Sequence, residues 1–595
     1  MAIYKAPLRD MRFVLHEMLD IERHLAGLDG CEDATAETID AVLAEAARIC
    51  EEVVLPTNAS GDEAGCTLED GAVRTPPGFA AAYHTLREGG WFSLGCDPAY
   101  GGQGLPHTLA VFFEEILQSS NLAFSLYPGL TRGAYMALHH HASDALKAAW
   151  MPRLVSGEWS AVMCLTEPHC GTDLGLLRTR AERADDGTYR ISGTKIFITG
   201  GDQDMTDNIV HLVLARLTDA PAGTRGISMF LVPKFLLDAS GEPGERNSLG
   251  VGSIEKKMGI KGASTCVMNY EGATGWLVGE ENRGLNAMFS MMNHERLMVG
   301  QQGLALGEVA YQSAAAYARE RLQGRSLGGA KSPEQAADPI IVHPDVRRML
   351  LTARAYNEGA RALFGWVSLQ VDRMERHPDP AVREAAGDLV ALLTPVVKAI
   401  FTDNGSEACN LCLQVLGGHG YIREWGMEQL VRDARIAQIY EGANGIHALD
   451  LVGRKLQLHG GRLLDRYLQE CREFLTSVRD RDDAREFVDP LAEALVRLEE
   501  ASAWLRGATA RDPEEIGAAS YDYMRLLALV AFGHMWARAA IVALDARNGD
   551  NSGFYESKIH TARFFVRRLL PQTASLLATL RAGADTLMDM PAEAF

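Results

Sequence analysis

Apolar residues recur every three or four positions along the first part of the chain, up to about residue 157. This spacing places them on one face of a helix, so it predicts helices separated by turn-rich sequence such as residues 101–104. The predicted helical ranges are 8–28, 39–54, 80–87, 109–118 and 134–154. We interpret residues 1–38 as an N-terminal extension and residues 39–158 as a helical domain.

The pattern then changes to short runs rich in Val, Ile, Phe and Thr, which are separated by turn signals. Such runs are typical of strands, and the Asp-Asp-Gly-Thr sequence at 185–188 predicts a hairpin turn. The predicted strands are 160–166, 189–198, 209–215, 226–233 and 266–270. Residues 159–282 are therefore predicted to form an all-β domain.

Helical spacing returns from residue 285 and continues through the rest of the chain. The predicted helices are 346–371, 381–416, one that begins near 448, 463–478, 490–505, 518–544 and 557–580. We assign residues 283–458 to a helical bundle and residues 459–595 to an additional helical domain. The predicted fold class is mainly α with a central β domain.

The composition is that of a large globular protein, with 595 residues of which 47% are hydrophobic and 23% charged. The net charge of -20 argues against a nucleic-acid partner, because a phosphate backbone would be repelled. No uninterrupted apolar run reaches the roughly 18 residues that span a bilayer, and the N-terminus lacks the basic-then-apolar plan of a signal peptide. We therefore expect a cytoplasmic protein without a membrane span.

The ten cysteines are few for a chain of this length. Cys409 and Cys412 have helical spacing inside an apolar helix, and no second cluster of Cys or His follows nearby. Structural zinc sites usually need four such ligands. We therefore predict no metal site and a reducing compartment.

One acidic residue, Glu441, stands between an apolar run and a glycine-rich, helix-ending sequence, in Ala-Gln-Ile-Tyr-Glu-Gly-Ala-Asn-Gly-Ile at 437–446. The neighbouring residues carry no positive charge and would leave the carboxylate little contact with water. Partial burial there would raise the pKa of the carboxyl and make it a usable base near neutral pH. The alternative is an exposed glutamate at a helix end, and the local residues do not decide between the two.

Two segments of the predicted β domain have the composition of a ligand-binding surface. In Cys-Leu-Thr-Glu-Pro-His-Cys-Gly-Thr-Asp (164–173), Thr166, Gly171 and Thr172 would let a ligand approach the backbone and would offer hydroxyl and amide donors. In Lys-Ile-Phe-Ile-Thr-Gly-Gly (195–201), an aromatic residue and a threonine close a strand. A flat aromatic ligand could lie between the segments, whereas the alternative is two ordinary turns. Neither segment is a phosphate-binding loop.

Three further segments belong to the predicted bundle. His-Glu-Arg-Leu-Met-Val-Gly (294–300) is interpreted as the start of a helix, and Arg-Glu-Arg-Leu-Gln-Gly-Arg (319–325) as its end. The clustered arginines suit bidentate contact with a pyrophosphate, although a solvated helix end has the same composition. Gln-Val-Leu-Gly-Gly-His-Gly (414–420) is a helix stop whose glycines would also admit a ligand closely.

Taken in this order, these segments and Met-Gly-Ile-Lys-Gly at 258–262 resemble the acyl-CoA dehydrogenase family. The resemblance extends from about residue 40 to 455, and it is specific as a set although each motif is weak alone. The extension before it and the helices after about residue 461 resemble a larger bacterial subgroup. The resemblance implies N-terminal helices, a middle β-barrel and a C-terminal four-helix bundle, with FAD between barrel and bundle, and a homodimer.

The resemblance also implies roles for individual residues. The residues that would hold the isoalloxazine ring are Leu165, Thr166, Phe197, Ile198 and Thr199. Those that would bind the diphosphate and adenosine end of FAD, usually across the dimer interface, are Arg321, Gln414 and Gly418. Thr172 would also reach toward the CoA side. Ala443 stands at a cofactor-contacting position that is often Thr in the family, so the hydroxyl that would make this contact is missing here.

The implied reaction is the α,β-dehydrogenation of an acyl-CoA thioester to a trans-2-enoyl-CoA, as in fatty-acid β-oxidation. Glu441 would remove the α-proton while the β-hydrogen leaves as hydride to FAD. Because the α-proton is weakly acidic, the thioester oxygen needs hydrogen-bond donors. The similar enzymes use the backbone N–H of the catalytic Glu and a flavin ribityl hydroxyl. Electrons would then pass to an electron-transferring flavoprotein.

A second carboxylate, Glu295, competes for the role of base, since some family members carry the base on the helix of the 294–300 segment. We favour Glu441 because its Tyr-Glu-Gly context is intact and because two ionised carboxylates facing one α-carbon would repel each other. Arg296 is then expected to orient the active-site loop electrostatically. Glu295 would be an acid at a helix start, which the macrodipole stabilises.

Two alternatives to a dehydrogenase remain. An acyl-CoA oxidase would pass its electrons to oxygen, and a flavin-free binding or scaffold relative would lack the base or the flavin-binding residues. For the substrate we expect medium-to-long straight acyl chains, with a short thioether-containing chain such as 3-methylmercaptopropionyl-CoA as the alternative. The additional helical domain is expected to form dimer contacts rather than a membrane-facing surface or a cover for the site.

Overall fold

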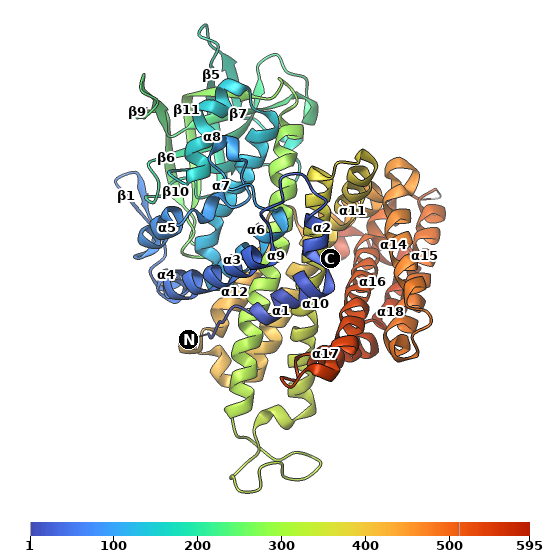
Figure 1. The fold of residues 1–595 in the computed structure, drawn as a ribbon. Helices are drawn as coiled ribbons and strands as arrows, with labels where there is room; N and C mark the ends of the chain where they lie inside the picture. The colour runs from blue at the N-terminus through green and yellow to red at the C-terminus, as the bar shows by residue number, and fades with distance from the viewer. Residues whose placement is uncertain (1, 511) are drawn as a thin grey trace. The chain divides into compact units, whose positions relative to one another are not determined.

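The computed structural model describes residues 2–510 and 512–595, and the chain folds into two compact units (Figure 1). The first, here called the bundle unit, comprises Met1–Ala44, Pro106–Glu115 and Val299–Phe595. The second, here called the barrel unit, comprises Glu45–Leu105 and Ile116–Met298. The predicted fold class, helical with a central β region, is confirmed.

Helices account for most of the chain, and the strands gather in one stretch of it. The helices are α1 (Leu8–Arg12), α2 (Ile21–Leu25), α3 (Ala36–Ile49), α4 (Thr57–Ala64), α5 (Phe79–Glu88), α6 (His107–Ser120), α7 (Leu122–His141), α8 (Asp144–Ser156), α9 (Gly284–Glu320), α10 (Pro344–Arg376), α11 (Pro380–Leu416), α12 (Met427–Ala437), α13 (Asn444–Gly453), α14 (Arg462–Ser477), α15 (Arg485–Thr509), α16 (Glu514–Ala546), α17 (Phe554–Phe564), α18 (Gln572–Leu580) and α19 (Asp585–Met588). The strands are β1 (Thr67–Glu69), β2 (Ala72–Arg74), β3 (Trp159–Cys164), β4 (Arg180–Arg183), β5 (Tyr189–Thr199), β6 (Asn208–Leu217), β7 (Ile227–Pro233), β8 (Phe235–Leu237), β9 (Pro243–Arg246), β10 (Leu249–Ile254) and β11 (Thr265–Val278).

Strand pairing closes the main sheet of the barrel unit on itself. β11 pairs with β5, β5 with β4, β4 with β6, β6 with β7, and β7 returns to β11. β10 adds to the ring antiparallel to β11, and β3 adds to it parallel to β6. Since closure leaves no edge within the ring itself, the predicted β-barrel is confirmed.

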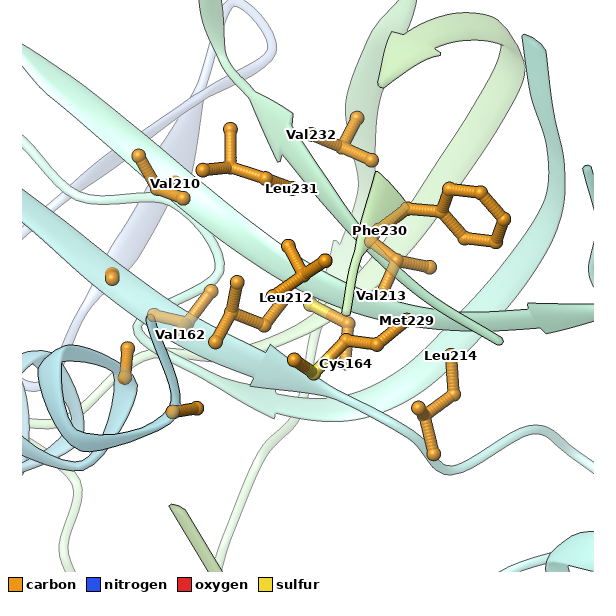
Figure 2. Packing of buried hydrophobic residues seen from close by; sticks show 14 of the residues in the cluster. Val162, Cys164, Val210, Leu212, Val213, Leu214, Met229, Phe230, Leu231 and Val232 are labelled. Carbon is orange, nitrogen blue, oxygen red and sulfur yellow. The ribbon is translucent and has the colours of Figure 1, made fainter. Parts of the chain in front are cut away.

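The core of the barrel unit is apolar on both sides of its central strands. Every residue of β7 is buried, and β6 is buried along nearly its whole length. Figure 2 shows Val162 and Cys164 of β3 beside Leu212 of β6 and Leu231 of β7. Helix α7 packs against β3, so these strands have no solvent face. Their sequences are mainly apolar rather than alternating, although the buried His211 interrupts β6.

Several strands escaped the sequence prediction because they are short or exposed. β4 has only Ala181 buried among charged neighbours, and β10 is exposed or half-buried at all but its first residue. All five predicted strands are present, and the hairpin turn at 185–188 joins β4 to β5 through a hydrogen bond from Ala184 N to Thr188 O of 2.9 Å. Apolar periodicity therefore located the buried strands but not the exposed ones.

The bundle unit is organised around α11, which packs against α10, α12, α13, α14 and α16. Among the described residues, two stretches, Pro380–Tyr421 and Glu514–Gly549, are long and apolar enough to cross a membrane. In each, 78% of the most apolar window is buried inside the protein, so both serve as core helices. Helices α9 and α11 approach each other closely at two glycines. A Cβ on Gly405 of α11 would lie 2.3 Å from the carbonyl oxygen of Gly303 of α9.

Three predicted helices are broken in the structure. The range 8–28 forms α1, a π-helical turn and α2, with Asp20 in the left-handed region at φ 47°. The range 134–154 divides between α7 and α8, where Ser143 caps the second helix. Pro571 separates α18 from the helical turns before it. The apolar spacing continues across each break, so periodicity alone joined the pieces.

A buried cluster of charges joins distant parts of the bundle unit. Arg361 of α10 is 1% exposed and donates to Glu115 at 2.6 Å, to Glu308 at 3.2 Å and to Asp10. Lys558 of α17 also donates to Asp10. Because removing one member of such a cluster leaves a buried charge uncompensated, breaking it should cost about 3–5 kcal/mol.

Candidate functional site

The structure brings together the two barrel segments that the sequence predicted as a ligand-binding surface. The ammonium of Lys195 donates to the carbonyl oxygen of Leu165 at 2.9 Å, and the amide of Ile196 donates to Thr166 O at 2.9 Å. The Leu-Thr-Glu-Pro segment is thus fastened along the end of β5.

Glu167 lies between these segments and has a structural role. It is 3% exposed and accepts hydrogen bonds from Lys195 Nζ at 2.9 Å and from the amide and hydroxyl of Thr179. Burial acts to raise the pKa of this carboxyl, but the Lys195 charge and the bonds from Thr179 bring it below its ordinary value. Ligand atoms of Glu167, His169 and Cys170 lie within 4.8 Å of one another. Because Lys195 already holds the carboxylate, we assign no metal there.

Phe197, in the second of these barrel segments, has an unusual backbone conformation. The register of β5 with β11 shifts between Ile198 and Lys195, which is a β-bulge, and Phe197 has a φ of 60° there. A bulky residue in the left-handed region is uncommon and costs energy, yet its ring is 59% exposed. The bulge therefore turns an aromatic side chain outward, as a flat ligand would require.

The other predicted flavin-contacting residues of the barrel differ in exposure. Leu165, Thr166 and Thr199 are half-buried, and Thr172 is exposed. Ile198 is only 2% exposed, because its side chain belongs to the barrel core. The prediction that Ile198 holds the ring therefore requires correction as far as the side chain is concerned. Only its peptide groups remain for that role.

Glu441 lies in the short loop between α12 and α13 of the bundle unit. It is half-buried, its φ is 55°, and the φ of the next residue, Gly442, is 90°. His447 Nε2 lies 3.0 Å from the carbonyl oxygen of Glu441, and Lys398 Nζ donates to Gly442 O at 2.6 Å. A non-glycine residue keeps such a conformation only where its surroundings enforce it.

Sequence reasoning missed the residues that enforce this conformation. Lys398 is fully buried in α11, His447 is 3% exposed in α13, and Tyr440 donates from its hydroxyl to Gln302 of α9. A lysine inside the apolar run Val-Val-Lys-Ala-Ile at 396–400 was the available signal, since a buried lysine needs a built partner.

The predicted diphosphate-binding residues lie at the ends of α9 and α11. Arg321 directly follows α9 and is exposed, as are Gln414 and Gly418 at the end of α11. The hydroxyl of Tyr317, one turn before Arg321, lies 2.9 Å from Nδ1 of His419. This contact brings the two helix ends together, so the prediction that both contribute to one site is geometrically possible within the bundle unit.

Ala443 occupies the N-cap position of α13 and makes no capping hydrogen bond. Its side chain has no oxygen that could accept from the amides of the first helical turn, as Ser, Thr, Asp or Asn would have. It is exposed. The missing hydroxyl noted in the sequence is therefore also a missing helix cap.

Glu295 has a setting different from the predicted one. Helix α9 begins at Gly284, so Glu295 lies about three turns inside the helix, and its interpretation as a helix-start acid is wrong. It is 6% exposed and belongs to the barrel unit. There α9 packs closely against α7, because a Cβ on Gly133 would lie 2.4 Å from Glu295 Oε1. Arg296 donates to Asn293 at 3.1 Å.

Within each unit taken by itself, the residues named from the sequence have chemistry that suits one part of FAD. The barrel half presents an exposed aromatic ring at Phe197 together with threonine hydroxyls. The bundle half presents the Arg321 guanidinium and the open backbone at Gly417 and Gly418, where an added Cβ would meet nothing within 4 Å. Stacking, neutral hydrogen bonds and a guanidinium suit an isoalloxazine, its carbonyls and a pyrophosphate.

Known families match nearly the whole chain. The N-terminal domain of acyl-CoA dehydrogenase matches residues 36–158, its middle domain residues 162–273 and its C-terminal domain residues 282–457. A family described as acetyl-CoA dehydrogenase C-terminal like matches residues 467–591. The last match covers the additional helices that follow the bundle.

Full-length relatives and solved structures agree with these matches. The 3-methylmercaptopropionyl-CoA dehydrogenase of Ruegeria pomeroyi is 41% identical over 98% of this chain and 99% of its own. The broad-specificity linear acyl-CoA dehydrogenase FadE5 of Mycobacterium tuberculosis is 33% identical over the full length of both. Caenorhabditis elegans ACDH-11 in complex with C11-CoA superposes with a TM-score of 0.76 at 19% identity, covering 96% of this chain and 92% of its own.

The acyl-CoA dehydrogenase of Bacillus anthracis complexed with FAD has the same fold, with a TM-score of 0.73 at 20% identity over 98% of this chain and 93% of its own. The four matched segments and the full-length relatives extend the resemblance from the motifs to nearly the whole chain. The chain belongs to the acyl-CoA dehydrogenase family and is an FAD-dependent oxidoreductase that dehydrogenates an acyl-CoA thioester.

Proposed function

We propose that Glu441 is the base that removes the α-proton of the acyl-CoA. The observation that carries this proposal is the loop conformation, in which a glutamate is held at φ 55° by buried contacts to the carbonyls of residues 441 and 442. Strain of this kind concentrates at functional sites. The half-buried setting also limits water around the carboxylate, which favours a base near neutral pH.

The surrounding residues would support this step in two ways. Contacts from His447 and Lys398 fix the two peptide groups that follow Glu441 in the chain, so the carboxylate is positioned before the substrate binds. A backbone N–H donor at Glu441 would stabilise negative charge on the thioester oxygen as the proton leaves. FAD supplies the acceptor for the β-hydride.

The residues proposed to hold FAD are those named from the sequence, with one change. On the barrel they are Leu165, Thr166, Phe197, Thr199 and the peptide groups of Ile198, with Thr172 toward the CoA side. On the bundle they are Arg321, Gln414 and Gly418, with the backbone of Ala443. The exposure of Phe197, Thr172 and Arg321 supports these assignments.

For the substrate, the relatives favour a short acyl chain. The expectation of medium-to-long chains rested on the large architecture, but butyryl-CoA dehydrogenase of Syntrophomonas wolfei is 32% identical over the full length of this chain. The architecture therefore does not select long chains. The 41% identity to a 3-methylmercaptopropionyl-CoA dehydrogenase makes a short straight or thioether-containing acyl group our first candidate. Linear chains of a broader range of lengths come second, because FadE5 is named a broad-specificity linear acyl-CoA dehydrogenase.

We further propose an electron-transferring flavoprotein as the electron acceptor, a homodimer as the assembly and the cytoplasm as the location. A solved structure of the electron transferring flavoprotein of Acidaminococcus fermentans has the same fold over 71% of this chain and 99% of its own, with a TM-score of 0.57 at 23% identity. Among the described residues, the two long apolar helices are mostly buried in the core. Oxygen consumption without that acceptor would instead identify an acyl-CoA oxidase. A purified protein without yellow colour would identify a flavin-free relative.

The test is an anaerobic titration of the purified protein with butyryl-, 3-methylmercaptopropionyl-, octanoyl- and palmitoyl-CoA, followed by flavin absorbance. We expect the wild type and Glu295→Gln to bleach, and Glu441→Gln to remain oxidised while still binding the ligand. Bleaching of Glu441→Gln together with loss of bleaching in Glu295→Gln would transfer the base to α9. The chain length that bleaches at the lowest concentration identifies the substrate class.

A further inference from the structure

One carboxylate, Asp403 of α11, connects both ends of the Glu441 loop. Its Oδ1 accepts from Gln438 Nε2 at 2.7 Å, just before the loop, and from Asn444 Nδ2 at 2.8 Å, just after it. Gln438 and Asn444 are also joined directly, by a backbone hydrogen bond of 3.1 Å. A single oxygen atom thus closes the base of the loop that carries the glutamate.

The second oxygen of Asp403 is engaged from the additional helical domain. Oδ2 accepts a hydrogen bond from the hydroxyl of Tyr521 on α16. Helix α16 also packs against α13, the helix that follows the loop. The helices after residue 459 therefore contact both the helix that follows the loop and the carboxylate that joins the two ends of the loop.

Asn444 extends these contacts to the peptide that follows Glu441. It is 6% exposed, and its amide oxygen accepts from Lys398 Nζ at 2.9 Å, while the same ammonium donates to Gly442 O at 2.6 Å. A continuous path of hydrogen bonds therefore runs from Tyr521 through Asp403, Asn444 and Lys398 to the residue after Glu441. Bonds to charged groups are the stronger ones in such networks.

We propose that Asp403 and Tyr521 are positioning residues that hold the Glu441 loop in its reactive conformation. The additional helical domain then acts as a brace for the catalytic loop, a role separate from the dimer contact expected from the sequence. This inference rests on the proposed role of Glu441. It assigns neither residue to contact with substrate or flavin.

The size of the effect depends on a cavity beside the brace. Asp403 and Tyr521, together with Glu407 and Arg525, line a cavity of about 240 Å³. A water molecule from this cavity can replace the hydroxyl that a Tyr521→Phe variant loses, which makes the loss of activity smaller.

We expect the rate constant for flavin reduction at saturating acyl-CoA to fall about tenfold in Tyr521→Phe and further in Asp403→Asn. KM should stay within about twofold of wild type.

The matched control is Tyr523→Phe on the same helix. Tyr523 is buried, and its hydroxyl lies 2.8 Å from Ser502 Oγ, entirely within the additional domain. This variant loses one buried tyrosine hydroxyl and its hydrogen bond to a neutral partner without touching the loop. We expect it to retain the wild-type rate of flavin reduction, even if its melting temperature falls as much as that of Tyr521→Phe.

The experiment measures flavin reduction by anaerobic stopped flow with protonated and α-deuterated butyryl-CoA, and hydrogen exchange of the peptide covering residues 436–447. A misplaced base makes proton removal more rate-limiting, so the α-deuterium isotope effect should rise in Tyr521→Phe and not in Tyr523→Phe. Exchange in the loop should accelerate only in Tyr521→Phe and Asp403→Asn.

The two hypotheses fail in different ways. Unchanged loop exchange in Tyr521→Phe, or an equal change in Tyr523→Phe, overturns the brace whatever the base is. Faster loop exchange with an unchanged rate of flavin reduction preserves the brace and overturns Glu441 as the base. Only slower reduction combined with faster loop exchange satisfies both.

Discussion

Glu441 and Glu295 are both carboxylates that the sequence offered as the base, and the structure gives them opposite settings. Glu441 lies in a loop of the bundle unit, in a strained conformation held by buried polar contacts. Glu295 lies inside a long helix of the barrel unit, in ordinary helical geometry against a glycine of α7. A strained backbone conformation persists only where the surrounding structure enforces it. Backbone conformation therefore distinguishes the two glutamates, which residue type alone does not.

The neighbours of the two carboxylates differ in the same sense. The Glu441 loop is fixed by directional contacts from Lys398 and His447, whose removal should move the carboxylate. Oε1 of Glu295 lies 2.4 Å from where a Cβ on Gly133 would stand, so a larger residue at Gly133 should affect stability first. Changes in hydrogen bonding therefore test the Glu441 loop, and a change in volume tests the packing around Glu295.

The largest effect is expected when the side chain of Glu441 is shortened by one methylene, and the same change at Glu295 serves as the comparison. Glu441→Asp should slow flavin reduction by about 100-fold or more, because a displacement of about 1 Å misaligns the base with the α-proton. Glu295→Asp should remain within a few-fold of wild type. Stopped-flow reduction by a saturating acyl-CoA measures both, and a reversed order would exchange the two roles.

Activity lost at low pH could come from protonation of Glu441 or from unfolding of the barrel. The pH dependence of stability distinguishes these two causes. His211 of β6 is fully buried, with Nδ1 2.8 Å from the hydroxyl of Tyr270, and burial lowers its pKa to about 4. In the unfolded chain its pKa is about 6.5. Between pH 6.5 and 4 His211 therefore binds a proton in the unfolded state but stays neutral in the folded state.

The barrel should thus lose up to about 3 kcal/mol of stability as the pH falls from 6.5 to 4. In His211→Asn, whose amide can replace the bond from Nδ1 to Tyr270, this slope should nearly disappear. Chemical denaturation at several pH values measures it, with the exposed His560→Asn as control. An acid limb of activity that persists in a folded His211→Asn variant does not come from unfolding of the barrel through His211.

A packing test addresses the Glu295 side alone. Gly133→Ala would place a Cβ 2.4 Å from Glu295 Oε1, and overpacking of this kind should destabilise the protein by about 1–3 kcal/mol. Gly129→Ala, one turn away on α7, meets nothing within 4 Å and should stabilise by about 0.5–1 kcal/mol. Thermal melting compares them. Equal melting temperatures would show that Glu295 moves aside freely.

The smallest effect is expected at the N-cap of α13. Ala443→Thr would supply a hydroxyl that accepts from the first turn of the helix, which should stabilise the protein by about 1 kcal/mol. The same hydroxyl would restore the side-chain oxygen that the family often has there. Flavin retention during dilution and the melting temperature measure the change, and Ala443→Val serves as the control of similar size without a cap.

The sequence predicted those parts of the fold that bury an apolar face. The long helices α10, α11 and α16 and the strands β6 and β7 follow their apolar patterns closely. β4, β8, β9 and β10 each bury at most one residue, so their sequences lack that pattern. The breaks near Asp20 and Ser143 were missed because they interrupt the backbone without interrupting the apolar spacing.

The candidate site was predictable in its motifs and not in its supports. The Glu441 loop and the barrel segments were found because their residues are adjacent in sequence. The partners of the loop, such as Lys398, Asp403 and Tyr521, come from positions separated from it by tens of residues, and no local pattern indicates which side chains will meet. The setting of Glu295 was misjudged because the start of α9 at Gly284 has no distinctive cap sequence.

The cluster around Arg361 constrains the order in which a nascent chain can fold. The barrel unit ends at Met298, so all of its residues are synthesised before those of α10 and α17. Asp10 must wait for Arg361 and then for Lys558, which both follow the barrel unit in the chain. Because domains fold as their segments emerge, the barrel can close early, whereas α1 is secured only after α17 has been made.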